Sequence, residues 1–162
     1  MKPAKTYLKW CLAQKKGIRV VTESENLQNA YLKKSGEALR SMQINAKEGI
    51  GEWVIATGYY TKYFAIYALL SRLGIKCEIH DCTIALFGPL FANVIPKQLM
   101  DDLKQAKDDR IEAQYYTTEI PTNSQEVIAK TTDFVLKIEE IIDGLNSQKI
   151  ADIQKNIKTL FG

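Results

Sequence analysis

Residues 58–88 read GYYTKYFAIYALLSRLGIKCEIHDCTIALFG, and the first half of this stretch decides the fold. Its apolar residues recur with the period of an α-helix, and Gly74 follows them where a glycine typically ends a helix. Because the segment is apolar on nearly every side, we predict a central, buried helix over 52–73. Its longest apolar run, 63–70, is far shorter than the roughly 18 residues that cross a bilayer, so no membrane association is expected.

The same period places further helices on both sides of this one. We expect a short opening helix that stops near Gly17, a second helix that begins at Ser24 or Glu25, and a short helix that begins near Asp81 and breaks at Gly88. Pro96 is placed to open the next helix in its first turn. The clearest bundle-facing pattern belongs to the helix that follows a predicted cap at Thr122. The positions along its inner face are alternately four and three residues apart: Val127, Thr131, Phe134, Ile138, Ile141 and Leu145.

Nine glycines and four prolines leave little room for sheets of short strands. The fold class that follows is all-α, an antiparallel up-and-down bundle of four to five core helices with short terminal helices. A chain of 162 residues with 46% hydrophobic and 25% charged residues fits one soluble domain. We expect that domain to span 1–162, with a core over about 22–146 and a C-terminal helix over 147–162.

The cysteines and the N-terminal residues bear on the cellular compartment of the protein. Cys11, Cys77 and Cys82 are odd in number, which argues against a disulfide scaffold and for reduced thiols. The first residues lack the apolar core of a signal peptide. We therefore expect a cytoplasmic protein.

Charge is uneven along the chain, although the net charge is only +3. Residues 1–50 carry ten Lys or Arg against four acids, whereas residues 51–162 carry twelve against fifteen. A basic end can bind phosphate backbones, can be a solvated face, or can pair with an acidic body in self-association. The sequence leaves all three open, and no DNA-binding motif is visible.

His80, the only histidine, lies in the segment CEIHDC between two cysteines. Zinc uses such groups, but a closed site needs a second cluster of ligands, which the chain lacks. We therefore expect neither a metal nor another cofactor. His80 is then either a general acid or base, since imidazole titrates near neutral pH, or a residue that caps and packs a turn.

Tyrosines and an arginine offer a second kind of site. Tyr60, Phe64 and Tyr67 share one face of the central helix, and Tyr59 and Tyr63 share a neighbouring face. These rings are core, or with Lys62 and Arg72 they line a groove that stacks bases. Arg110 and Gln114 lie one turn apart, with Tyr116 following. Arg110 can clamp a phosphate or pair with a buried carboxylate, and no Gly-rich phosphate loop competes with it.

The order of these segments resembles a known superfamily. The helix YYTKYFAIYALLSRLGIK, the turn CEIHDCTIALFG, the run RIEAQYY and the helix carrying DFVLKIEEII resemble the small stand-alone HEPN proteins over roughly residues 25–145. The resemblance implies an up-and-down bundle that is often a homodimer. It also implies RNA cleavage, nucleotide binding, or toxin–antitoxin pairing with a minimal nucleotidyltransferase.

One departure from the superfamily matters for function. Its ribonuclease members carry an arginine and a histidine a few residues apart on one helix, whereas here seven residues, Gly74 among them, separate Arg72 from His80. Three hypotheses remain. The first is a module that binds a nucleotide or RNA through Tyr60, Lys62, Arg72 and Tyr116 around His80 and Arg110. The second is an interaction protein for a nucleotidyltransferase, and the third is a metal-independent ribonuclease that uses His80 and Arg110.

Overall fold

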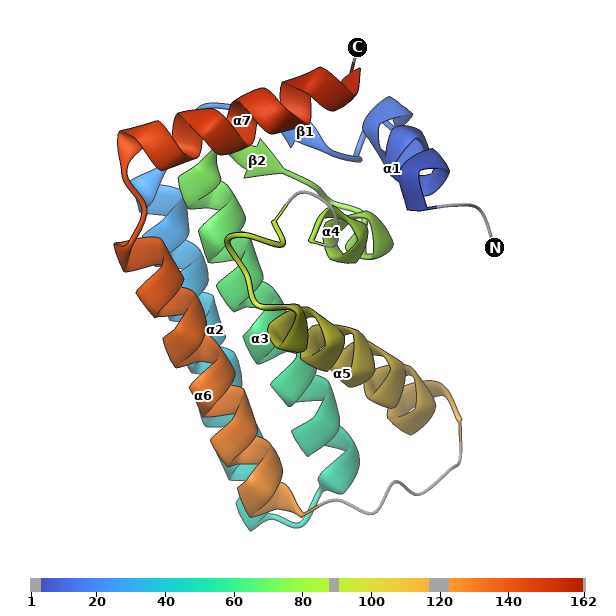
Figure 1. Ribbon diagram of the computed structural model, residues 1–162. Helices are drawn as coiled ribbons and strands as arrows, with labels where there is room; N and C mark the ends of the chain where they lie inside the picture. The colour runs from blue at the N-terminus through green and yellow to red at the C-terminus, as the bar shows by residue number, and fades with distance from the viewer. Residues whose placement is uncertain (1–3, 88–90, 117–122, 162) are drawn as a thin grey trace.

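The computed structural model describes residues 4–87, 91–116 and 123–161 (Figure 1). The bundle consists of α2 (Glu25–Lys47), α3 (Gly51–Leu73), α5 (Lys97–Tyr115) and α6 (Ser124–Asp143). These four helices run alternately down and up in Figure 1, and α3 contacts each of the other three. Of the 23 residues of α3, 14 are buried, against two of the 23 in α2. The predicted all-α bundle with a central third helix is confirmed.

The ends of the central hairpin follow the local chemistry of the sequence. Ser24 caps α2 by accepting a hydrogen bond from the Leu27 N–H at 3.1 Å. Gly74 ends α3 at φ 67, in the left-handed region that favours glycine. A Cβ atom at Gly74 would lie 2.6 Å from the Val21 carbonyl oxygen, so no other residue fits this close approach.

Three shorter helices surround one end of the bundle: α1 (Ala4–Ala13), α4 (His80–Leu86) and α7 (Ser147–Phe161). α7 lies across this end in Figure 1, and Gln154 Nε2 donates to the Leu73 carbonyl at 2.8 Å. Within the described residues, no helix is long and apolar enough to cross a membrane.

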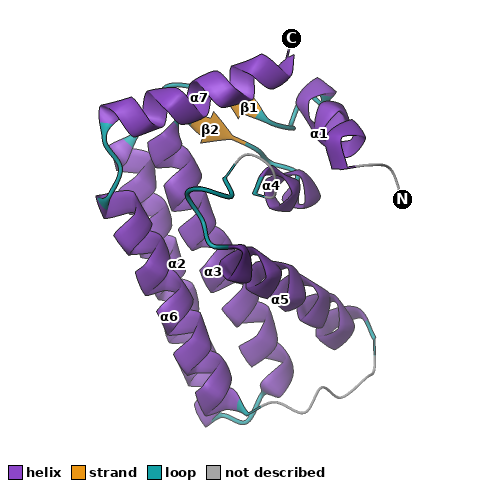
Figure 2. Ribbon diagram, in the orientation of Figure 1, coloured by secondary structure: helices purple, strands orange, loops and turns teal. Residues whose placement is uncertain are grey.

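Two details differ from the sequence predictions. β1 (Arg19–Val20) pairs antiparallel with β2 (Ile75–Lys76), so the chain does contain one small sheet (Figure 2). Two-residue strands carry no periodicity, which is why the sequence does not reveal them.

Pro96 is the N-cap of α5, one residue before the helix. The predicted break at Gly88 and the predicted Thr122 cap lie outside the described residues, and Asn123 caps α6 by accepting from the Glu126 N–H at 3.2 Å.

Candidate functional site

Three tyrosines of α3 hold the turn that carries His80. The Tyr59 hydroxyl lies 2.8 Å from His80 Nδ1, and the Tyr63 ring stacks on the imidazole with 4.1 Å between centroids. One turn further on, the Tyr67 hydroxyl donates to the Cys77 carbonyl at 2.7 Å. A spacing of four places these three rings on one face of α3. The imidazole is therefore held in one position, half-buried at the start of α4.

Arg110 of α5 covers the same tyrosines. Its guanidinium carbon lies 5.1 Å from the centroid of the Tyr59 ring and 5.5 Å from that of Tyr60. Nη1 donates to the Tyr60 hydroxyl at 2.9 Å and to Gln114 Oε1 at 3.3 Å. These are neutral partners, and Arg110 forms no salt bridge within the described part of the chain. Its Nε is buried and has no hydrogen-bond partner there either.

We call Tyr59, Tyr60, Tyr63, His80 and Arg110 the His80–Arg110 cluster. It joins residues of α3, α4 and α5 that lie far apart in sequence. The guanidinium and the imidazole both contact Tyr59, which is fully buried and connects them. The alternative that Arg110 pairs with a buried carboxylate does not match its observed partners.

The electrostatics of the cluster favour neutral His80. Burial, together with the positive charges of Arg110 and Lys107, lowers the pKa of His80 below its ordinary value, and Asp81 opposes this shift in part. Lys107 forms an ion pair with Asp81, the residue after His80. Burial also raises the pKa of Tyr59, whose hydroxyl therefore keeps its proton. When the Tyr59 hydroxyl donates to Nδ1, the proton of neutral His80 is on Nε2.

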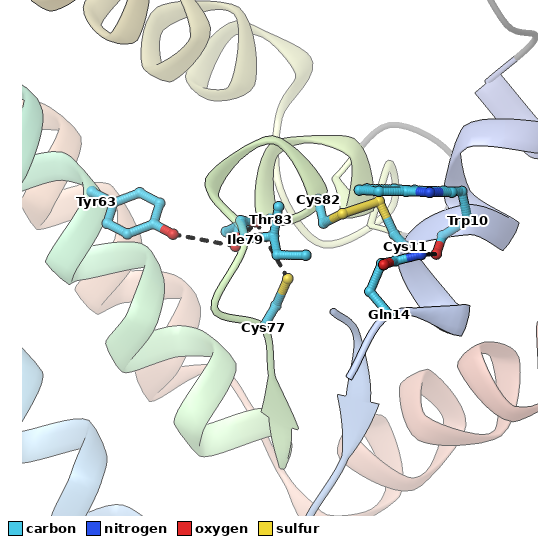
Figure 3. The surroundings of a disulfide bond; sticks show 8 residues. All are labelled: Trp10, Cys11, Gln14, Tyr63, Cys77, Ile79, Cys82 and Thr83. Atoms are coloured by element: carbon cyan, nitrogen blue, oxygen red, sulfur yellow. Dashed lines mark hydrogen bonds between the residues drawn. A yellow bond between two sulfur atoms is a disulfide. The ribbon is translucent and has the colours of Figure 1, made fainter. Parts of the chain in front are cut away.

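A disulfide bond supports α4 from the other side. Cys11 of α1 and Cys82 of α4 are bonded across 71 residues of sequence (Figure 3). The prediction of three reduced thiols is therefore wrong for two of them. The odd count does not exclude a pair, because Cys77 is left over as a buried free thiol, and its Sγ lies 3.5 Å from the Ile79 carbonyl oxygen. The disulfide attaches the basic N-terminal segment to the helix that carries His80.

The remaining predicted binding residues lie elsewhere. Lys62 is 6% exposed and its Nζ lies 3.1 Å from Asp102 Oδ2, on a different face of α3. Arg72 pairs with Glu23 at 3.2 Å near the opposite end of α3, about 13 residues or ~20 Å from Tyr59 along the helix. Tyr116 is exposed at the C-cap of α5. The structure thus brings together His80, Arg110 and Tyr60, and places Lys62, Arg72 and Tyr116 apart from them.

The sequence does not single out Lys107, and it indicates Asp81 only as the start of a helix and Tyr59 only as one of several rings. The spacing of four between Tyr59 and Tyr63 predicted a shared face, but Tyr67, eight residues from Tyr59, was assigned to the face of Tyr60 and Phe64 instead. No such signal links Lys107 to Asp81, because they lie 26 residues apart on different helices. In the described residues, no three His, Cys, Asp or Glu side chains gather as they would around a metal ion.

The comparisons agree with the architecture. No curated protein matches the chain. The family model described as HEPN domain matches residues 28–148, which include most of α2, all of α3, α4, α5 and α6, and therefore every residue of the His80–Arg110 cluster. The match leaves out α1 and β1, the segment that the disulfide attaches. Since it covers well over half of the sequence, the chain belongs to the HEPN family.

Proposed function

We propose that the protein binds the phosphate groups of RNA or of a nucleotide at the His80–Arg110 cluster. The observation that carries the proposal is the state of Arg110, a partly buried guanidinium whose partners are neutral oxygens and whose Nε has no partner among the described residues. A guanidinium stays charged at any physiological pH. A phosphate can accept two parallel hydrogen bonds from the planar guanidinium and would complete its hydrogen bonding.

The surroundings of Arg110 suit the rest of a nucleotide. The Tyr60 ring is half-buried, and aromatic rings beside a cation are the usual platform on which bases stack. Neutral His80 has one ring nitrogen left for a ligand after its contact with Tyr59. The attached N-terminal segment contains six basic residues before the first acid, Glu23. These positive charges would attract a polyanion.

The test is equilibrium binding measured by fluorescence anisotropy, with a labelled single-stranded RNA pentamer and with labelled ATP as separate probes. Arg110→Ala is expected to weaken binding at least tenfold, since a charge-assisted bidentate contact is lost. The matched control is Arg72→Ala, which removes the same charge from the opposite end of α3 and should change affinity less than twofold. Binding of wild type should weaken as salt is added.

The two probes separate the two sources of phosphate, a strand and a free nucleotide. If neither binds, the proposal is contradicted, and the interaction protein that pairs with a nucleotidyltransferase becomes the better hypothesis. Equal losses for Arg110→Ala and Arg72→Ala would also contradict it, because binding would then depend on overall charge alone.

One observation also supports the ribonuclease hypothesis: His80 and Arg110 share the Tyr59 ring, so a potential base lies beside a potential stabiliser of phosphorane charge. In such a reaction His80 would be the tautomer whose Nδ1–H donates to the Tyr59 hydroxyl oxygen, so that Nε2 is free to take the proton of a ribose 2′-hydroxyl. The 2′-oxygen would attack phosphorus to form a 2′,3′-cyclic phosphate, and the 5′-oxygen would leave as a hydroxyl with a proton supplied by water. Loss of cleavage in His80→Ala, with RNA binding retained, would support this function. Equal cleavage of RNA and of a 2′-deoxy strand would contradict it.

A further inference from the structure

A second polar site lies on the adjacent face of α3, in a pocket of about 260 Å³ between α3, α5 and α6. Each helix lines the pocket with residues spaced three and four apart, so one face of each helix is turned toward it. The polar members of the lining are Lys62, Asp102, Gln105, Asp109, Lys130 and Thr131. Tyr59 also lines the pocket, and its ring is covered by Arg110 at 5.1 Å. The pocket and the His80–Arg110 cluster therefore share one aromatic side chain.

Two polar side chains in the pocket are almost completely buried, and neither has its full set of hydrogen bonds from the described residues. Lys62 is 6% exposed, and its ammonium pairs with Asp102 at 3.1 Å and lies 5.6 Å from the centre of the Phe134 ring. An ammonium has three N–H groups, and the described salt bridge uses one. Thr131 is fully buried, and its Oγ1 has no hydrogen-bond partner among the described residues. Buried polar atoms are normally paired, so these two indicate a ligand or water that the site is built to hold.

The charge of the pocket limits the ligand. Lys62 and Lys130 are matched in number by Asp102 and Asp109, so the lining has no excess of positive charge to attract a phosphate. It offers donors on Lys62 and Thr131 and acceptors on the two carboxylates. An uncharged molecule with acceptors and donors along one edge satisfies both kinds of group.

The volume limits it further. Pockets for drug-sized ligands begin at about 300 Å³, so this pocket suits a single ring system better than a whole nucleotide. We infer that the pocket takes the heterocyclic base of a nucleotide whose phosphate is held by Arg110. Carbonyl and ring-nitrogen acceptors of the base face Lys62 and Thr131, and an exocyclic amine faces a carboxylate. This inference rests on the proposed function, because Tyr59 places the pocket next to the phosphate site.

The test compares RNA pentamers A5 and U5 with a base-free ribose-phosphate chain of the same length, in anisotropy competition with the full-length protein. Wild type is expected to bind at least one of the two RNAs about tenfold more tightly than the base-free chain. Thr131→Val keeps the side-chain shape and removes the hydroxyl, and it should weaken RNA binding about fivefold without changing binding of the base-free chain. The matched control is Thr132→Val, since the Thr132 hydroxyl bonds the Ile128 carbonyl of its own helix at 2.9 Å and the residue does not line the pocket.

A second variant keeps the test independent of one hydrogen bond. Gly58→Ala would place a Cβ 3.6 Å from Thr131 Oγ1, within the pocket lining, and 3.0 Å from the flexible end of Met42. Because alanine favours the helix, this variant should remain folded while it reduces the preference for RNA over the base-free chain.

The outcomes separate this inference from the proposed function. Equal binding of RNA and base-free chain by wild type, with both weakened by Arg110→Ala, would leave the phosphate site standing and overturn the base pocket. Unchanged RNA binding in both Thr131→Val and Gly58→Ala would also overturn it. Failure of wild type to bind any of the three chains would overturn the proposed function and the pocket together.

Discussion

Two cations lie on different faces of α3, Lys62 of that helix and Arg110 of α5, and they differ in whether a carboxylate balances their charge. Lys62 is almost fully buried and has a carboxylate partner in Asp102 at 3.1 Å. Arg110 is partly buried and is surrounded by two aromatic rings, a tyrosine hydroxyl and a side-chain amide. A balanced cation contributes to a neutral pocket, whereas an unbalanced one leaves room for an anion from outside. The counter-ion, more than the burial of the cation, therefore distinguishes the two sites.

The same comparison explains how one helix can serve both regions. Tyr59 contacts His80 and Arg110 and also lines the pocket that Lys62 faces. α4 and its disulfide support only the His80 side, because no residue of α4 lines the pocket.

The largest effect is expected from breaking the disulfide between Cys11 and Cys82. A bond that closes a loop of 71 residues stabilises a protein by about 4 kcal/mol in the loop-entropy account. Cys11→Ala should lower the free energy of unfolding by that order, measured by urea denaturation without reductant, and a reductant should lower wild type to the same level. RNA binding should weaken as well, because α4 carries His80. If reductant did not change the free energy of unfolding of the wild-type protein, the two thiols would not be bonded in solution.

The next effect comes from removing the counter-ion of Lys62. Asp102→Asn leaves a buried ammonium without its carboxylate. Loss of a fully buried partner costs about 3–5 kcal/mol, but the Asp102 side chain is 38% exposed and water can replace it, so we expect about 2 kcal/mol. The matched control is Asp101→Asn, which breaks an exposed pair with Lys97 one helical turn away and should cost less than about 0.5 kcal/mol. Similar melting temperatures for both variants would contradict the role assigned to burial.

A smaller effect is expected when Arg110 becomes lysine. Arg110→Lys keeps the charge but loses the planar fork and its stacking on Tyr59 and Tyr60, so RNA affinity should fall about tenfold, or ~1.4 kcal/mol. Stability should hardly change. Arg72→Lys is the control in the same binding assay, and an equal loss there would remove the distinction between Arg110 and an ordinary surface cation.

The smallest effect is a dependence of stability on pH. The folded state lowers the pKa of His80 below its ordinary 6.5 through burial and the charges of Arg110 and Lys107. The unfolded chain therefore binds the proton more readily, and stability is lost as pH falls below about 6.5. In His80→Gln this part of the pH profile should flatten when unfolding is measured from pH 7.5 to 5. If the free energy of unfolding of His80→Gln fell with pH as steeply as that of wild type, groups other than His80 would cause the pH dependence.

Much of the fold could be predicted from the sequence because its signals are local. Ser24 caps α2, Gly74 ends α3, and the apolar spacing of α6 is visible in a few turns. The pairing of β1 with β2 and the bond between Cys11 and Cys82 join segments far apart in sequence, which neither periodicity nor a count of cysteines can identify.

The candidate site, too, could be predicted from the sequence only where its signals are local. Residue chemistry singled out His80 and Arg110, and the contact of Arg110 with Gln114 followed from helical spacing. Lys62 was grouped with them because it lies close to Tyr60 in sequence, but successive helix positions face different neighbours, and Lys62 is turned toward Asp102. The shared use of Tyr59 depends on how α3, α4 and α5 pack, which only the structure provides.

The central claim, that Arg110 receives a phosphate beside His80, has a direct test in the NMR signal of the imidazole ring. His80 is the only histidine of the sequence, so in an untagged protein the imidazole Hε1 resonance can be followed without overlap from another histidine. Its pKa should lie below 6.5 in the free protein and should rise when AMP or the RNA pentamer is added, because a bound phosphate offsets the charge of Arg110. In Arg110→Ala the rise should be absent. A resonance that neither shifts nor changes its pKa at saturating RNA would contradict the claim.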